Sequence, residues 1–349
     1  MNGQLGRRFV TLAHGAGGKE TQELLDRMLF QKLEKKLKSV EGGVGLDSPD
    51  DAAALPIGDQ FLVATVDSYT VSPLIFPGGD IGSLAASGSI NDVLMMGGKP
   101  LALLDATVVE EGFDLDLLSQ LMDSLMATLR RESIPLIGGD FKTMPKGQLD
   151  KIIITTVGLG LTRRPIVDAE LKPGDKIVVT GSMGDHGATI LALQQGVDVL
   201  KSGLESDAKP LTSFMLPVID RFGKGLHAAR DPTRGGLAMT LNDWAKGSGT
   251  VVAVDEAAIP VKESVRLYLG MLGIDPLYLA NEGAAVLGVE PGIADAVLRT
   301  LKEAGAKDAA IIGEARKPKE HRGIVLLKSG IGGFRILEAP AGNLVPRIC

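Results

Sequence analysis

Acidic residues in the first half of the chain recur beside glycine or at the expected ends of strands. They are Asp50, Asp51, Asp67, Asp80, Asp92 and Asp140. Mg²⁺ prefers oxygen ligands and usually bridges one or two carboxylates to the phosphates of a substrate, so short Asp side chains at such junctions are a suitable supply. Any single Asp is also a common turn former or helix cap. Their repetition favours a site for magnesium and a nucleotide.

A glycine-rich segment, His14-Gly15-Ala16-Gly17-Gly18, leads directly into an expected helix. Bare backbone N–H groups followed by a helix N-terminus can hold an anion such as a phosphate. The spacing matches neither a Walker A loop nor a dinucleotide fingerprint. A flexible turn at the entry of the helix is the alternative interpretation.

Further polar residues could act on a bound substrate. Lys142 follows an expected strand and Asp140, where it could contact a phosphoryl group or, if desolvated, act as a base. An exposed, solvated lysine is the commoner case. One turn before an expected helix in the second half contains Arg230, Asp231 and Arg234. These residues could bind a substrate oxyanion, or they could form an Arg–Asp pair that caps the helix.

Asn281 and Glu282 precede a β-rich segment, where a carboxylate could serve as a general base. The only cysteine, Cys349, is the last residue. A thiol is a soft nucleophile, and a chain end is usually mobile, which suits a carried group. A stray terminal thiol is the alternative, because terminal residues are often unconstrained.

Composition restricts the kind of protein. The net charge of -6 and the absence of a basic stripe argue against a nucleic-acid surface. A single cysteine excludes an intramolecular disulfide. The first ten residues lack the apolar core of a secretory signal, and no apolar run approaches the roughly 18 residues of a membrane span. The chain is therefore expected to be cytoplasmic and not bound to a membrane.

The pattern of apolar residues predicts an α+β protein of two domains. Helices are expected at 20–38, 82–97 and 115–131, and strands at 61–66, 101–109, 134–137 and 152–161. The polar, proline-containing segment 162–175 is the expected junction, and beyond it helices and strands cluster instead of alternating strictly. We expect a first domain at 1–162, a second domain at 163–337 and a mobile tail at 338–349.

Several motifs together carry a resemblance over essentially the whole chain. They are His14-Gly15-Ala16-Gly17-Gly18, Asp50-Asp51-Ala52-Ala53, Val66-Asp67-Ser68, Gly79-Asp80-Ile81-Gly82, Asn91-Asp92-Val93-Leu94-Met95-Met96-Gly97, Gly138-Gly139-Asp140, Arg230-Asp231-Pro232-Thr233-Arg234-Gly235-Gly236-Leu237 and Pro346-Arg347-Ile348-Cys349. The chain resembles the HypE family of hydrogenase maturation factors. This family belongs to a superfamily with aminoimidazole ribonucleotide synthetase and selenophosphate synthetase. One departure is Phe141, where the family pattern leads us to expect Thr.

The resemblance implies an activity and partners. It implies ATP-dependent dehydration of a carbamoyl group on Cys349 to a thiocyanate, which supplies cyanide for the iron of [NiFe] hydrogenase. It also implies a homodimer that pairs the N-terminal sheets, with ATP and Mg²⁺ bound near the interface. A HypF-like carbamoyltransferase should load the thiol, and a HypC–HypD-like scaffold should accept the cyanide.

The resemblance also assigns roles to the residues above. The pool of metal ligands is Asp50, Asp51, Asp67, Asp92 and Asp140. Nucleotide contacts are expected from His14, Gly15, Gly17, Gly18, Asp67, Asn91 and Asp92. Lys142 and Glu282 are expected to orient and deprotonate the carboxamide carried on Cys349. Polar support is expected from Arg230, Asp231, Arg234 and Asn281.

Two other kinds of function remain open at this point. A selenophosphate synthetase resembles the chain, but it carries a reactive Cys or selenocysteine in its N-terminal glycine-rich region, and residues 1–20 contain neither. The ATP motifs would also suit aminoimidazole ribonucleotide synthetase or thiamine-monophosphate kinase, neither of which needs a terminal cysteine. A non-catalytic assembly protein would use the tail only as a docking peptide.

Overall fold

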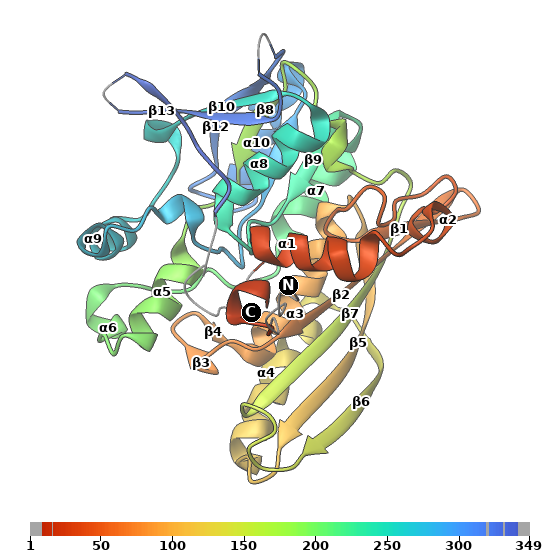
Figure 1. The fold of residues 1–349 in the computed structure, drawn as a ribbon, viewed down its shortest axis with the longest axis vertical. Coiled ribbons are helices and arrows are strands. Elements are labelled where there is room, and N and C mark those ends of the chain that lie inside the picture. The colour runs from red at the N-terminus through yellow and green to blue at the C-terminus, as the bar shows by residue number, and fades with distance from the viewer. Residues whose placement is uncertain (1–8, 16, 319–320, 331, 341–349) are drawn as a thin grey trace, which may run out of the picture.

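The computed structural model describes residues 9–15, 17–318, 321–330 and 332–340, which form two large sheets with helices packed against them (Figure 1). A two-stranded sheet of β3, Ile75–Phe76, and β4, Gly79–Asp80, is separate from both. The first sheet has five strands in the order β1-β2-β7-β5-β6. Their bounds are β1 Ala53–Ile57, β2 Gln60–Tyr69, β5 Lys99–Glu110, β6 Leu136–Met144 and β7 Ile152–Thr162. β7 is rich in β-branched residues and lies in the middle of this sheet, as its composition predicts.

Helix α3, Ile81–Met95, is the central helix of the molecule. It packs on β2, β5 and β7 with one side and on α4, Leu115–Glu132, with another. Nearly all its residues are buried, including Met95 at its end, and Met96 directly after it is buried as well. Asp80 caps it: its carboxylate accepts a hydrogen bond from Ser83 N, while Ser83 Oγ accepts one from Asp80 N. Asp80 is thus a helix cap.

The second sheet has seven strands in the order β14-β13-β10-β12-β8-β11-β9. Their bounds are β8 Lys176–Val179, β9 Leu226–Arg230, β10 Val251–Asp255, β11 Val286–Val289, β12 Ala310–Arg316, β13 Ile324–Lys328 and β14 Phe334–Ile336. The helices are α5 Asp185–Gln194, α6 Val199–Ser202, α7 Thr212–Phe222, α8 Gly236–Ser248, α9 Glu263–Leu272 and α10 Ala294–Glu303. The mixture of sheets and segregated helices confirms the α+β prediction.

Three differences from the predicted elements matter. The single helix expected at 20–38 is wrong: α1, Lys19–Leu25, passes into a π-helical turn at Asp26–Phe30, and α2, Lys35–Lys38, is separate. β6 does not stop before the Gly-Gly-Asp motif but continues through it to Met144. Strands β1, β9 and β12 were not predicted, because short apolar runs without clear alternation are hard to assign.

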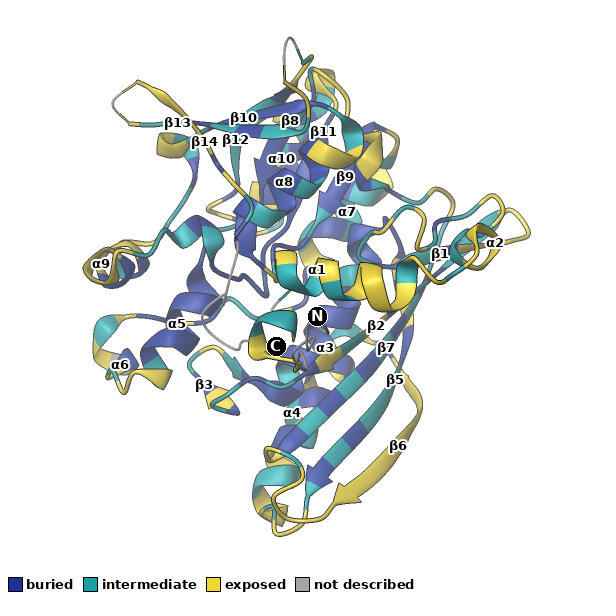
Figure 2. Ribbon diagram, in the orientation of Figure 1, coloured by how far each residue is buried: buried dark blue, intermediate teal, exposed yellow. Residues whose placement is uncertain are grey.

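One face of the first sheet has no helix against it among the described residues. Thr156 Oγ1 donates to Ala85 O of α3, so its neighbour Val157 points to the opposite face of the sheet. Val157 lies between Val66 and Leu104 in one cross-strand row. Figure 2 shows β6 exposed along its whole length. In the described part of the chain, no helix is both long and apolar enough to cross a membrane.

Candidate active site in the cleft between the domains

A cleft of about 670 Å³ lies where the two domains meet, and both contribute to its walls. The first domain contributes the ends of its loops, strand β2 and helix α3, and the second contributes the turns after β9 and before β11. Its polar lining includes Asp50, Asp51, Thr65, Asp67, Asp92, Asp168, Arg230, Asp231, Arg234, Asp243, Lys246 and Glu282. Gly17 and Gly18 line it as well. The cleft therefore gathers most of the residues whose types suggested chemistry.

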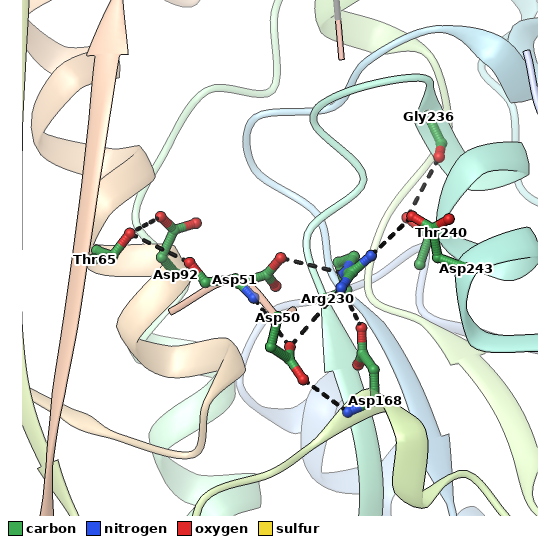
Figure 3. A network of polar contacts seen from close by, with 9 residues as sticks. All are labelled: Asp50, Asp51, Thr65, Asp92, Asp168, Arg230, Gly236, Thr240 and Asp243. Carbon is green, nitrogen blue, oxygen red and sulfur yellow. Dashed lines mark hydrogen bonds and ion pairs between the residues drawn. The ribbon is translucent and has the colours of Figure 1, made fainter. Parts of the chain in front are cut away.

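Arg230, at the end of β9, binds four carboxylates from three separate segments (Figure 3). Its Nη2 lies 2.8 Å from Asp168 Oδ2 and 4.0 Å from Asp50 Oδ1, and its Nε lies 3.3 Å from Asp51 Oδ1. Its Nη1 donates to Asp243 Oδ2 at 3.1 Å. With its guanidinium surrounded in this way, Arg230 holds the acidic loops in place and is not a free clamp for a substrate oxyanion.

Burial changes the acid–base behaviour of the carboxylates around Arg230. Desolvation raises the pKa of Asp50 and of Asp51 to about 7, and that of Asp168 to about 8, although the charge of Arg230 opposes the shift. Deeper in the cleft, desolvation raises the pKa of Asp92 well above its usual range, and the charges of Asp51 and Asp67 add to this. Thr65 Oγ1 donates to Asp92 Oδ2 at 2.5 Å, which partly offsets the rise.

Glu282 and Asp231 are buried acids of the cleft, and each has a carboxylate oxygen without a hydrogen-bond donor in the part of the chain that the structure describes. Desolvation raises the pKa of each well above the usual range, and neighbouring carboxylates raise it further. Glu282 Oε1 and Asp231 Oδ2 are buried and accept no hydrogen bond from the described residues, and the same holds for Asp51 Oδ2. Buried oxygens without donors are costly unless a cation or a ligand approaches them.

These unpartnered oxygens fit a divalent cation delivered with a polyphosphate. Within the described residues, no group of three or more His, Cys, Asp or Glu is arranged to hold a metal ion by itself. Mg²⁺ usually takes only one or two carboxylates from a protein and completes its shell with phosphates and water. The donor set suits Mg²⁺ with a nucleotide better than a metal enclosed by protein ligands alone.

Two family models match the chain in succession, and the matching relatives cover 97% of it. The models are the AIR synthase related protein N-terminal domain at residues 49–162 and the corresponding C-terminal domain at 172–326. A putative hydrogenase expression/formation protein of Methanocaldococcus jannaschii is 41% identical over 343 residues, 97% of this chain and 99% of that protein. Carbamoyl dehydratase HypE of Escherichia coli is 37% identical over 345 residues, again 97% and 99%. The chain belongs to the HypE family.

Solved HypE structures share the fold. A hydrogenase maturation protein HypE in complex with ATP has a TM-score of 0.80 and 37% sequence identity, and the match covers 98% of this chain and 100% of that one. A HypE–HypF complex gives a TM-score of 0.82 with 33% identity, covering 93% and 100%. The HypE family is one of enzymes, and this chain is a member with both domains.

Two expected site residues, Asn281 and Asn91, do not line the cleft but form hydrogen bonds with segments next to it. Asn281 Nδ2 donates to Ser182 O and Asp207 Oδ2, both at 2.8 Å, and its Oδ1 accepts from Gly184 N. Asn91 Nδ2 donates to Lys209 O and Glu282 O. Both amides are thus used to fix backbone, and neither lines the cleft.

Only part of the glycine-rich loop lies at the cleft. Gly17 and Gly18 line the cleft, whereas His14 and Gly15 do not. His14 Nδ1 instead accepts a hydrogen bond from Thr11 N at 3.0 Å. Gly17 has a φ of +77°, and a Cβ there would lie 2.6 Å from Cδ of Arg234. The loop therefore needs glycine at position 17 in order to lie against Arg234.

Asp140 and Lys142 do not join the cleft of their own chain. They form an exposed ion pair of 2.8 Å on β6, the edge strand of the first sheet. Asp140 is next to Ala106 and Lys142 is next to Val108, so both lie on the face that carries Val157. Cys349 lies outside the described residues.

Sequence reasoning missed Asp168, Asp243 and Thr65, which complete the polar network of Figure 3. Asp168 lies in the polar junction segment, where an acidic residue is common. The pattern of apolar residues along α8 predicts that Asp243 is on the solvent-facing side of the helix. Thr65 sits one strand position from Val66 and two from Asp67, and alternation along β2 would have placed Thr65 and Asp67 on one face. That was the one usable signal.

Proposed function

We propose that the chain is an ATP-dependent carbamoyl dehydratase that acts on an S-carbamoyl group carried by its own Cys349. Support comes from the relatives named carbamoyl dehydratase HypE and from the HypE solved with ATP. The product, a thiocyanate on the same sulfur, is a source of cyanide for the iron of a [NiFe] hydrogenase.

Mg²⁺ and ATP would be held by the acidic side of the cleft. Asp51, Asp67 and Asp92 line it and come from the loop before β1, from β2 and from α3. A bound Mg²⁺ would neutralise phosphate charge during phosphoryl transfer. Arg230 keeps the loop of Asp50 and Asp51 in position, and Gly17 and Gly18 offer backbone next to Arg234.

The observation that carries the proposal is the state of Glu282. It is 2% exposed, faces the cleft and has a carboxylate oxygen without a hydrogen-bond donor. A carboxylate with a raised pKa is a better proton acceptor than an ordinary one. Glu282 is therefore our candidate for the base that removes the N–H protons of the carboxamide.

The chemistry balances with these groups alone. The carbamoyl oxygen attacks the γ-phosphorus of ATP, the bond to the bridging oxygen breaks, and ADP leaves while one N–H proton goes to Glu282. The second N–H proton then passes to the departing phosphate, which leaves as hydrogen phosphate while the carbon–oxygen bond breaks and the carbon–nitrogen triple bond forms. Glu282 returns its proton to solvent. The sum is thiocarbamate plus ATP giving thiocyanate, ADP, hydrogen phosphate and one proton.

We also propose that the chain acts as a homodimer joined through the uncovered face of its first sheet. The row of Val66, Val157 and Leu104 on that face is apolar, and Val66 is 67% exposed. Exposed apolar patches of this kind mark interaction surfaces. A partner on this face would also bury Asp140 and Lys142, which could then act with the partner's nucleotide site.

The other partners follow from the same proposal. The HypE–HypF complex supports a HypF-like carbamoyltransferase as the protein that loads Cys349. A HypC–HypD-like scaffold would accept the cyanide. A tail that ends in the reactive cysteine would serve both encounters.

A single-turnover experiment tests the activity. The chain is S-carbamoylated at Cys349, ATP and Mg²⁺ are added, and intact mass is followed for the loss of one water from the C-terminal peptide. Glu282→Gln should slow this loss by about 100-fold or more, because it removes the base. The control Glu314→Gln, on β12 and outside the lining of the cleft, should react at the normal rate.

Two outcomes would decide against parts of the proposal. A normal rate for Glu282→Gln would end the role of Glu282 as the base. No water loss in the unaltered chain would end the dehydratase proposal itself. Cys349→Ser separates carrier from docking peptide, since a docking role survives the change and a carrier role does not.

A further inference from the structure

The chain just before the tail is fixed to helix α8 by buried contacts. After β14, Leu337 N donates to Val325 O at 2.9 Å, so the sheet ladder reaches residue 337. The side chain of Leu337 is fully buried in the core of the second domain. Its carbonyl accepts a hydrogen bond of 2.9 Å from Asn242 Nδ2, in the middle of α8.

A second buried contact lies nearer the cleft. Pro340 is buried, and Gly235, directly before α8, has a φ of +68°. A Cβ on Gly235 would lie 2.9 Å from Pro340 Cγ. Residues 337–340 therefore run along α8 from Asn242 toward its N-terminal end, and Pro340 lies against Gly235. Gly235 directly follows Arg234, which lines the cleft.

We infer that Asn242 is a positioning residue for the reaction, because it fixes the point from which the tail starts. This inference rests on the proposed function, in which Cys349 carries the substrate. Among the described residues, the segment ends at Pro340, which is buried. The nine residues 341–349 can span at most about 30 Å when extended.

A fixed starting point matters because the substrate is tethered. The effective concentration of a tethered group depends on where the tether begins and on its length. Asn242 donates to Ala238 O at 2.8 Å as well, so its amide links the helix to Leu337 and is 6% exposed. Loss of this amide should let residues 337–340 leave α8 and should lower the concentration of Cys349 at the cleft.

The test compares a tethered and a free substrate. Asn242→Leu keeps the size of the side chain but removes the donor. In the full chain loaded at Cys349, single-turnover water loss should slow by about threefold or more. With a synthetic S-carbamoyl peptide of residues 341–349 supplied to Cys349→Ser chains, Asn242→Leu should leave kcat/KM unchanged. Ser248→Ala, which also removes a bond from α8 to a carbonyl four residues back, should change neither rate.

Each result bears on the inference. Equal tethered rates for Asn242→Leu and the unaltered chain would overturn it, and so would an equal loss with tethered and free substrate. Hydrogen exchange at Leu337 N–H is a second readout that does not need the reaction: it should speed up in Asn242→Leu and not in Ser248→Ala. If neither substrate loses water in the unaltered chain, the proposed function fails, while the exchange result still decides whether Asn242 fixes the segment.

Discussion

At the scale of single residues, the acidic loops of the cleft depend on Arg230, which contacts more of their carboxylates than any other described cation does. Arg230 contacts Asp50, Asp51, Asp168 and Asp243, and it is largely buried. Removing one side of a buried ion-pair network leaves charges without compensation, which usually costs more than the network contributes in total. The local structure of the acidic loops should therefore be sensitive to this one side chain.

Arg230→Met should lower the free energy of unfolding by about 3–5 kcal/mol at pH 8. The loss should be smaller at pH 5, because the carboxyls with a raised pKa are then protonated and need no cation. Urea unfolding at the two pH values measures both effects. Arg316→Met, which removes an exposed pair with Glu314, serves as the control and should cost at most about 1 kcal/mol. Equal losses for the two variants would contradict the role of Arg230.

The raised pKa values also predict how stability depends on pH. Asp50 and Asp51 have a pKa of about 7 and Asp168 of about 8 in the folded chain, against an ordinary value near 4 when unfolded. The folded chain binds more protons in between, so this contribution to stability is fully present below about pH 4 and is lost as pH rises through 7 to 8.

Urea midpoints for the chain without nucleotide should therefore fall between pH 5 and pH 8.5. Substituting Asn for Asp168 should reduce that fall, since Asn cannot titrate. A urea midpoint that stays level or rises between pH 5 and pH 8.5 would show that other titrating groups determine the pH dependence of stability more than the cleft carboxyls do. Adding Mg²⁺ with a non-hydrolysable ATP analogue should restore more stability at pH 8.5 than at pH 5.

The sequence alone identified most acidic residues of the cleft, but it did not show which of them bind Arg230 and which face the cavity. Asp51, Asp67, Asp92 and Glu282 do line one cavity. The motif could not show that Arg230 is fully occupied by carboxylates, because three of its partners come from distant segments. Nor could it show that Asp80 caps a helix, since a cap and a metal ligand use the same residue type in the same setting.

At the scale of elements, the contact between the glycine-rich loop and Arg234 joins two parts of the chain that are far apart in sequence. Gly17→Ala places a Cβ within 2.6–2.8 Å of the Arg234 side chain and at an unfavourable φ, so the loop must shift. The dissociation constant for ATP should rise about tenfold, as measured by titration calorimetry. Gly15→Ala is the control, because nothing lies within 4 Å of its added Cβ. Similar affinities for both variants would separate the loop from nucleotide binding.

The bounds of some helices and strands could be predicted from the apolar pattern, and those of others could not. The helix predicted at 20–38 is interrupted near Gln31. The helical spacing of apolar residues at 24–33 gave no indication of the turn that follows Phe30. By contrast, α3 was predicted within two residues of its bounds despite its glycines, since its apolar content is high on every side. β6 was cut short because a Gly-Gly-Asp sequence is typical of a turn, and only pairing with β5 keeps it extended.

At the scale of the whole molecule, the uncovered sheet face is the main surface that the single chain leaves unexplained. Val157→Lys puts a charge in the centre of the row of Val66, Val157 and Leu104. If this face joins two chains, light scattering should show a dimer for the unaltered protein and a monomer for the variant. Met271→Lys, on α9, changes an equally apolar but 79% exposed side chain and should leave the dimer intact. A dimer that survives Val157→Lys would place the interface elsewhere.

The hydrogen bonds of Asn91 have a consequence for how the enzyme works. Its neighbour on α3, Asp92, belongs to the acidic side of the cleft, while Asn91 itself binds the carbonyl of Glu282 and the backbone at Lys209 and Leu211. One buried helix, α3, thus fixes the separation between Asp92 and Glu282. Under the proposed function these two carboxylates are a ligand of Mg²⁺ with ATP and the base. Their spacing is then set before any substrate binds, without closure of the two domains, so the site is preorganised.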